Sequence, residues 1–78
     1  MIMRLIISLF LTLLVTVSFT QPSSNDVFQA RAEFRQGMQK GVEKDFHGAL
    51  QHFSEAINLN PIYAEAFLYR GLSYNEVN

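Results

Sequence analysis

Residues 52–61 read HFSEAINLNP, and residues 62–74 continue directly with IYAEAFLYRGLSY. In both stretches apolar residues recur every three or four positions, which is the spacing of one face of an α-helix. A residue before proline avoids helical backbone angles, whereas proline itself fits the first turn of a helix. We therefore expect one helix to end before Asn60 and Pro61 to lie in the first turn of the next. So short a connection predicts that the two helices pack antiparallel.

The remaining sequence adds an earlier helix, so the predicted fold class is all-α. Three helices are expected, over residues 26–40, 46–59 and 62–75. Ser23 or Ser24 is the expected cap of the first helix, and Gly41 with the sequence EKD at residues 43–45 is expected to break it. The middle helix carries one unbroken apolar stripe, which consists of Phe46, Ala49, Leu50, Phe53, Ala56 and Ile57.

The chain also resembles itself at a distance of 34 residues. Shifting it by this distance aligns Phe28 with Ile62, Ala30 with Ala64, Ala32 with Ala66, Phe34 with Leu68, Gly37 with Gly71 and Met38 with Leu72. A fixed period of this size is typical of proteins that stack copies of one supersecondary unit. The sequence therefore predicts a helical repeat.

Motifs within this period resemble the tetratricopeptide repeat, whose pattern over about 34 residues is W-x2-L-G-x2-Y, then A-x3-F, then P. The matching positions are Gly37, Ala49, Phe53, Ala56, Pro61, Phe67, Gly71 and Tyr74. In the first copy the positions for Trp, Leu and Tyr hold Glu33, Gln36 and Lys40. The resemblance covers residues from about 30 to 78 and amounts to about one and a half repeats.

The resemblance implies an antiparallel helix-turn-helix repeat, a three-helix fragment of an α-solenoid, that acts as a non-catalytic protein–protein interaction module. In this family the first helix of each pair lines the ligand-facing side. The residues carried over to that side are Arg31, Phe34, Met38, Glu65, Leu68, Leu72 and Asn75. The phenylalanine, methionine and leucines among them favour an apolar or helical ligand segment over a terminal carboxylate. The alternative is that this stripe folds inward or is covered by a second copy of the chain.

The residue types also predict how the helices pack. Glycine inside a helix costs about 1 kcal/mol relative to alanine, so Gly37 and Gly71 predict close approach of a neighbouring helix at both positions. The large side chains expected to carry most of the stability are Phe46, Phe53, Ile57 and Phe67. Tyr74 is expected in the core, and Tyr63 and Tyr69 are candidates for exposed anchors.

The polar residues offer no pattern that predicts catalysis or metal binding. His47 and His52 are five residues apart, which separates them by about 140° around a helix. Glu43, Asp45 and Glu55 lie nearby, but no spacing places three ligands on one face. We interpret both histidines as ordinary polar-face residues, and we expect no enzyme activity, no cofactor, no metal and no small-molecule substrate.

The amino-terminal residues have the order of a secretory signal peptide. Met1 to Arg4 is positively charged, residues 5–19 are apolar and uncharged, and residues 20–24 are small and polar. The alternative is an uncleaved apolar helix that anchors the chain, with the membrane contacted only through residues 2–20. Either way we expect the remainder to be extracytoplasmic, secreted or periplasmic, or anchored to the membrane. The predicted organisation is signal peptide or anchor in residues 1–20, linker in 21–26 and repeat domain in 27–78.

The charge and the absence of cysteine restrict the partners of this chain. Without residues 1–20 it holds five basic and seven acidic residues, a formal charge of −2, and the basic residues are scattered, so nucleic acid is an unexpected partner. So small a domain without disulfides usually needs a metal or an associated chain. We expect another protein or peptide segment, or copies of the chain itself, as the partner. The alternative is a truncated repeat fragment without an independent binding function.

Overall fold

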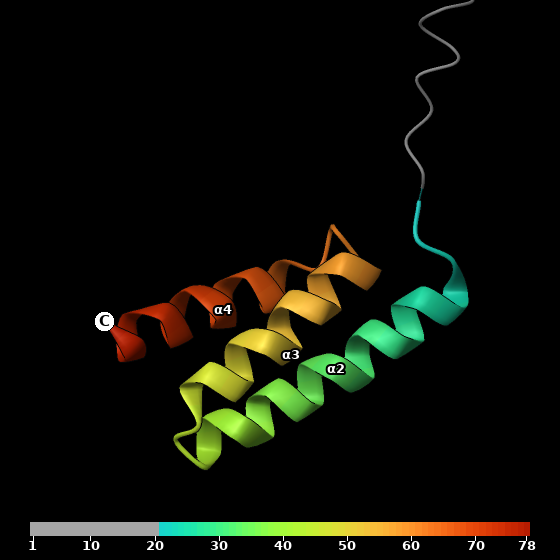
Figure 1. Cartoon of the computed structure of the whole chain (residues 1–78). Helices are drawn as coiled ribbons and strands as arrows, with labels where there is room; N and C mark the ends of the chain where they lie inside the picture. Colours follow the sequence, from blue (N-terminus) through green and yellow to red (C-terminus); the bar gives the residue numbers. More distant parts are fainter. Residues whose placement is uncertain (1–20) are drawn as a thin grey trace, which may run out of the picture.

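The computed structural model describes residues 21–78, which form three α-helices and no strand. The helices are α2 (Ser24–Val42), α3 (Phe46–Leu59) and α4 (Ala64–Val77). Each helix runs antiparallel to the next, and α3 lies between α2 and α4 (Figure 1). The predicted all-α class and the antiparallel packing are confirmed for this part of the chain. The expected signal peptide or apolar amino-terminal helix falls in residues 1–20, outside the described residues.

The start of α2 follows the predicted cap, and its end follows the predicted break in part. The Ser23 hydroxyl accepts a hydrogen bond from the Asp26 backbone N–H at 3.1 Å, and the Asp26 carboxylate accepts one from Ser23 N–H. This reciprocal pair is a capping box. The helix continues through Gly41 to Val42, so the part of the prediction that places the break at glycine is wrong, whereas residues 43–45 lie outside the helices as predicted. The chain turns at Lys44, whose φ of 62° lies in the left-handed region.

The junction between α3 and α4 contains a short turn that the sequence did not predict. Asn60 leaves the helix with a ψ of 90°, as expected for a residue before proline. Pro61 and Ile62 then form a turn instead of the first helical turn, and α4 begins at Ala64, so its predicted start at Ile62 is wrong. The Asn60 side-chain oxygen accepts a hydrogen bond from Ile62 N–H at 3.3 Å, which stabilises this turn.

The core is built from small residues that surround one large ring. Four alanines are completely buried, namely Ala30, Ala49, Ala56 and Ala66. Phe53 is 2% exposed and is the largest fully buried side chain of the described residues. Its ring lies against Gly37, where a built Cβ atom would be only 2.5 Å from Phe53 Cε1. The predicted close approach at Gly37 is therefore confirmed.

An aromatic cluster joins all three helices. Phe34 of α2 has ring-centroid distances of 5.6 Å to Phe53 in α3, 5.2 Å to Tyr63 and 5.7 Å to Tyr69 in α4. Tyr63 and Tyr69 are half-buried, so the prediction that they are exposed anchors is wrong. Tyr74, predicted in the core, is 49% exposed. The cluster holds α4 through the tyrosines at its start and middle.

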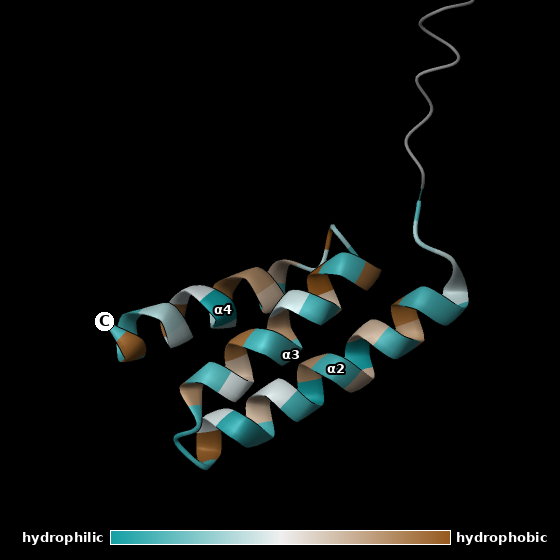
Figure 2. Ribbon diagram, viewed as in Figure 1, coloured by the Kyte–Doolittle hydropathy of each residue, from teal (hydrophilic) through white to brown (hydrophobic). Residues whose placement is uncertain are grey.

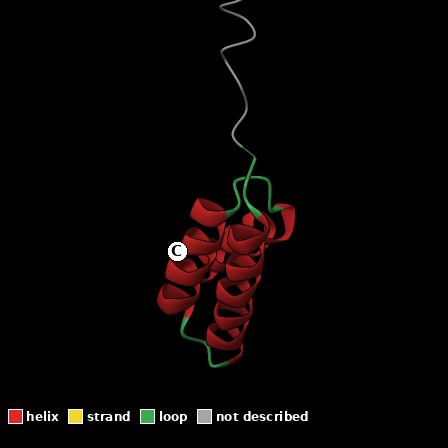
Figure 3. Ribbon diagram, turned by 90° about the vertical axis from the view of Figure 1, so that its right-hand side faces the viewer, coloured by secondary structure: helices red, strands yellow, loops and turns green. Residues whose placement is uncertain are grey.

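Each of the three described helices carries both hydrophilic and hydrophobic residues, and none is apolar all round (Figure 2). A view turned by 90° shows the α2–α3 loop at one end of the helices and the α3–α4 turn at the other (Figure 3). None of the three described helices combines the length and apolar character that crossing a bilayer requires.

Candidate functional site

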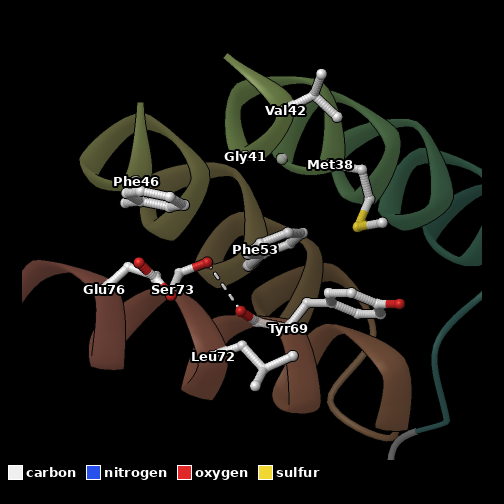
Figure 4. A pocket seen from close by; sticks show the side chains of 10 residues that line it. Met38, Gly41, Val42, Phe46, Phe53, Tyr69, Leu72, Ser73 and Glu76 are labelled. Atoms are coloured by element: carbon white, nitrogen blue, oxygen red, sulfur yellow. Dashed lines mark hydrogen bonds between the residues drawn. The ribbon is translucent and has the colours of Figure 1, made fainter. Parts of the chain in front are cut away.

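A pocket of about 370 Å³ opens between α2 and α4, with α3 behind it. Its lining residues are Gly37, Met38, Gly41, Val42, Phe46, Phe53, Tyr69, Leu72, Ser73 and Glu76. Figure 4 shows side chains from all three helices converging on this space, with Phe53 near its centre. The lining is mostly apolar, so the pocket is suited to hold an apolar group.

Helical spacing explains why these side chains meet. On α2, Met38 and Val42 are four residues apart and therefore lie on the same face. On α4 the lining residues follow the same rule, since Leu72 and Ser73 come three and four residues after Tyr69. Gly41 leaves open space on the α2 side, because a Cβ built on it has no neighbour within 4 Å, whereas the space beside Gly37 is taken by the Phe53 ring. The pocket is thus open beside Gly41 and walled by large residues of all three helices.

Few polar groups face the pocket. The Ser73 hydroxyl donates a hydrogen bond to the Tyr69 backbone carbonyl at 2.8 Å, so its proton is already used within α4 (Figure 4). Glu76 is exposed and places its carboxylate beside the opening. The site therefore offers apolar contact area together with one negative charge.

The structure divides the predicted ligand-facing stripe into three groups. Met38 and Leu72, which are equivalent in the 34-residue repeat, both line the pocket. Phe34 folds inward into the aromatic cluster, which is the alternative that the sequence left open. The remaining four members are exposed, and none of them lines the pocket. They are Arg31, Glu65, Leu68 and Asn75. Two of the seven residues therefore belong to one site.

The burial of the repeat positions depends on the helix on which they lie. On α2 and α3, Gly37, Ala49, Phe53 and Ala56 are buried. On α4, Phe67 is 43% exposed and Gly71 has no atom within 4 Å of a built Cβ. The expectations of a core role for Phe67 and of close approach at Gly71 are therefore wrong for residues 21–78. The cause is that no described helix lies against this face of α4.

The two histidines have different environments. His47 is exposed, whereas His52 is half-buried and its Nδ1 lies 2.8 Å from Glu33 Oε2, within hydrogen-bond distance. His52 thus connects α3 to α2 through a polar contact, which the sequence did not predict. Within residues 21–78 no group of three or more acidic, histidine or cysteine side chains is arranged to hold a metal.

Several lining residues were missed by the sequence analysis. Val42 was placed beyond the end of its helix, although it follows Met38 by four residues. Phe46 was assigned only to the core, and Tyr69 only to the surface. For Val42 and Tyr69 the missed signal is the spacing from Met38 and Leu72, since residues three or four positions away share their faces. Glu76 follows from the same rule, four positions after Leu72, and Ser73 follows four positions after Tyr69.

Comparisons of the chain with family models, with curated proteins and with solved structures found no match. The resemblance to the tetratricopeptide repeat therefore stays a prediction.

Proposed function

We propose that this chain is a non-catalytic protein–protein interaction module whose pocket takes an apolar side chain of a partner segment. The observation that carries the proposal is the pocket between α2 and α4, walled by Met38, Val42, Phe46, Tyr69 and Leu72 over the Phe53 ring. Pockets for small molecules usually add several convergent polar groups that orient the ligand. Here Ser73 is engaged within its own helix, which favours a partner recognised by apolar contact.

The repeat architecture supports this proposal. We infer that α2, α3 and α4 are one and a half tetratricopeptide repeats, because the 34-residue period relates Met38 to Leu72 and both line the pocket. A site formed by equivalent positions of successive repeats suits an elongated partner segment. The charged, apolar and small-polar order of residues 1–24 supports an extracytoplasmic or membrane-anchored location.

A second candidate is a repeat fragment that has no binding role of its own. The open face of α4 around Gly71 favours it, since this face is uncovered in residues 21–78. The two candidates differ in one respect that can be measured, which is whether the pocket selects a ligand.

A peptide-display experiment tests the proposal. The immobilised full chain would be panned against random 16-residue peptides, and the enriched peptides titrated against the wild type, Leu72→Asp and Ile62→Asp. Leu72 lines the pocket, whereas Ile62 is 75% exposed in the turn before α4 and does not line it. We expect Leu72→Asp to weaken binding at least tenfold, about 1.4 kcal/mol, and Ile62→Asp to change it less than twofold.

Helix content measured by circular dichroism would show that both variants remain folded. Enriched peptides that bind the two variants equally would contradict the assignment of the pocket. Failure to enrich any peptide would favour the fragment without a binding role.

A further inference from the structure

The pocket between α2 and α4 carries a charge at one of its ends. Among the lining residues, all of which belong to residues 21–78, Glu76 is the one with a charged side chain. Glu76 lies in the last turn of α4 and Phe46 in the first turn of α3, so the antiparallel course of the two helices brings them to the same end (Figure 4). Tyr69 lines the pocket two turns earlier on α4. A side chain that fills the pocket therefore has a carboxylate at one end of it.

The Glu76 carboxylate differs from the other acidic groups at this end of the helices. Lys40 Nζ lies 3.9 Å from both Glu43 Oε2 and Asp45 Oδ2. Residues 40–45 hold two basic and two acidic side chains, so their formal charges cancel. Glu76 is exposed and takes part in none of the ion pairs found among residues 21–78. It therefore adds a net negative charge beside the pocket.

Filling the pocket changes the surroundings of this carboxylate. A partner segment that covers Leu72 and Phe46 removes water from the side of Glu76 that faces them. A carboxylate that loses water without gaining a partner is destabilised, whereas a cationic donor would form a charge-assisted hydrogen bond with it. A purely apolar segment would thus bind against an electrostatic cost, and a basic residue in the segment would remove this cost.

On the basis of the function proposed above, we propose that the partner segment carries an arginine beside its apolar anchor, and that this arginine pairs with Glu76. Arginine fits this place better than lysine. Its planar guanidinium can donate two parallel hydrogen bonds to one carboxylate, and it can also lie against an aromatic ring such as that of Phe46.

The geometry of α4 gives the distance between the anchor and the arginine. Glu76 follows Leu72 by four residues, which is about 6 Å along the helix axis. In an extended partner segment, residues on the same side are two positions and about 7 Å apart. The arginine is therefore two positions from the anchor in an extended segment and four positions from it in a helical one.

Parallel selections test this assignment. The immobilised full chain and its variant Glu76→Gln would each be panned against the random 16-residue peptides. Glu65→Gln is the matched control, because Glu65 is exposed on the same helix, does not line the pocket, and its substitution changes the formal charge equally. We expect the wild type and Glu65→Gln to enrich peptides with arginine two or four positions from an apolar residue. Glu76→Gln should not enrich this arginine.

Titrations then measure the ion pair itself. The tightest peptide selected on the wild type is prepared with its arginine and with citrulline, which keeps the shape of the side chain but is uncharged. We expect citrulline to weaken binding to the wild type and to Glu65→Gln about tenfold, and to Glu76→Gln less than about twofold. Circular dichroism would show that all variants have the same helix content.

The outcomes separate this assignment from the pocket itself. Peptides that bind Leu72→Asp weakly but bind Glu76→Gln as tightly as the wild type would overturn the role of Glu76 and leave the pocket as the binding site. Peptides that are insensitive to Leu72→Asp, or no enriched peptide at all, would overturn both.

Two further results would also overturn the pairing with a partner arginine. Equal weakening by Glu76→Gln and Glu65→Gln would mean that the net charge of the chain attracts the peptide. Lower stability of Glu76→Gln in urea without any peptide would mean that a basic residue of the chain itself pairs with Glu76.

Discussion

Two glycines in the same register of the repeat have opposite environments. Gly37 faces the Phe53 ring, and a built Cβ would lie 2.5 Å from Cε1, 2.7 Å from Cδ1 and 3.0 Å from Cζ of that ring. Gly71 has open space at the same position. Of these two glycines, only Gly37 has a ring of residues 21–78 in the space that a side chain would occupy. At Gly71 the usual cost of a helical glycine is not offset by packing.

Alanine at each glycine is therefore expected to change stability in opposite directions. Gly37→Ala gains helix propensity of about 1 kcal/mol, but it forces the buried Phe53 ring to move, and such overpacking costs about 1–3 kcal/mol. We expect a net loss of stability. Gly71→Ala is expected to stabilise the chain by about 0.5–1 kcal/mol. Urea unfolding followed by circular dichroism measures both changes, and a stabilising Gly37→Ala would contradict the packing described at α2.

At the residue level the sequence predicted the buried small positions better than the aromatic ones. Ala49, Ala56 and Phe53 were recognised because the stripe of α3 faces a neighbour on both sides. The tyrosines were assigned in the wrong order, with Tyr74 buried and Tyr69 exposed. Their burial depends on the rotation of α4 about its axis and on which of its faces has a neighbour. The helical period of the sequence predicts neither the rotation of α4 nor which of its faces has a neighbour.

At the level of elements, α2 and α3 are joined by a polar contact as well as by the alanine and phenylalanine packing. His52 Nδ1 and Glu33 Oε2 are 2.8 Å apart, and the two side chains are 27% and 28% exposed. Hydrogen bonds of this kind contribute more when they are sheltered from water than at an open surface. The contact also fixes the register of the two helices, because it joins residues 19 positions apart.

A double-mutant cycle would measure this contact. We expect His52→Ala and Glu33→Ala each to lower the free energy of unfolding, and the double variant to lose less than the sum of the two. The expected coupling is about 0.5–1.5 kcal/mol, measured by urea unfolding at a single pH and salt concentration. The pair Lys40 and Asp45 serves as the comparison, since its side chains are 41% and 49% exposed and its coupling should be smaller. Additive losses at His52 and Glu33 would contradict the contact.

The limits of α3 were predicted correctly because local residues define both of its ends. The Asp45 carboxylate accepts a hydrogen bond from Gly48 N–H at 3.0 Å at the start, and Pro61 follows the last residues at the end. The start of α4 has no side-chain cap, so nothing local marked it. It was predicted two residues too early. The end of α2 depends on Lys44, whose φ of 62° lies in the left-handed region. Lysine does not favour this region, so the residue type did not predict the turn.

For the whole molecule, the pocket requires three helices to be placed correctly, and this explains why it was predicted only in part. Met38 and Leu72 were found from the repeat, which relates equivalent positions of α2 and α4. Phe46 contributes from the first turn of α3, and its position relative to the other helices follows from the crossing geometry. The apolar stripe of one helix does not predict where that helix lies relative to the others. The contribution of Phe46 to the pocket was therefore found only in the structure.

The three helices are expected to unfold together because the Phe34 ring of α2 contacts aromatic rings of both α3 and α4. All three tyrosines lie in residues 63–74, and the chain has no tryptophan, so the near-ultraviolet tyrosine signal reports on α4 and the turn before it. The far-ultraviolet signal reports on all helices. We expect the two signals to give one coincident transition in urea, as two-state unfolding requires.

Removing the Phe34 ring should separate these transitions. The ring lies within 5.7 Å of both Tyr63 and Tyr69, whereas α2 and α3 retain the contact between Gly37 and Phe53. In Phe34→Ala the tyrosine signal should therefore be lost at lower urea than the helix signal, with a total destabilisation of about 1.5–3 kcal/mol. Phe28→Ala is the matched control, because Phe28 is 67% exposed on the same helix and should change stability by less than about 0.5 kcal/mol. Coincident transitions in Phe34→Ala would mean that the packing of α4 against α3 is sufficient to keep the three helices cooperative without the aromatic cluster.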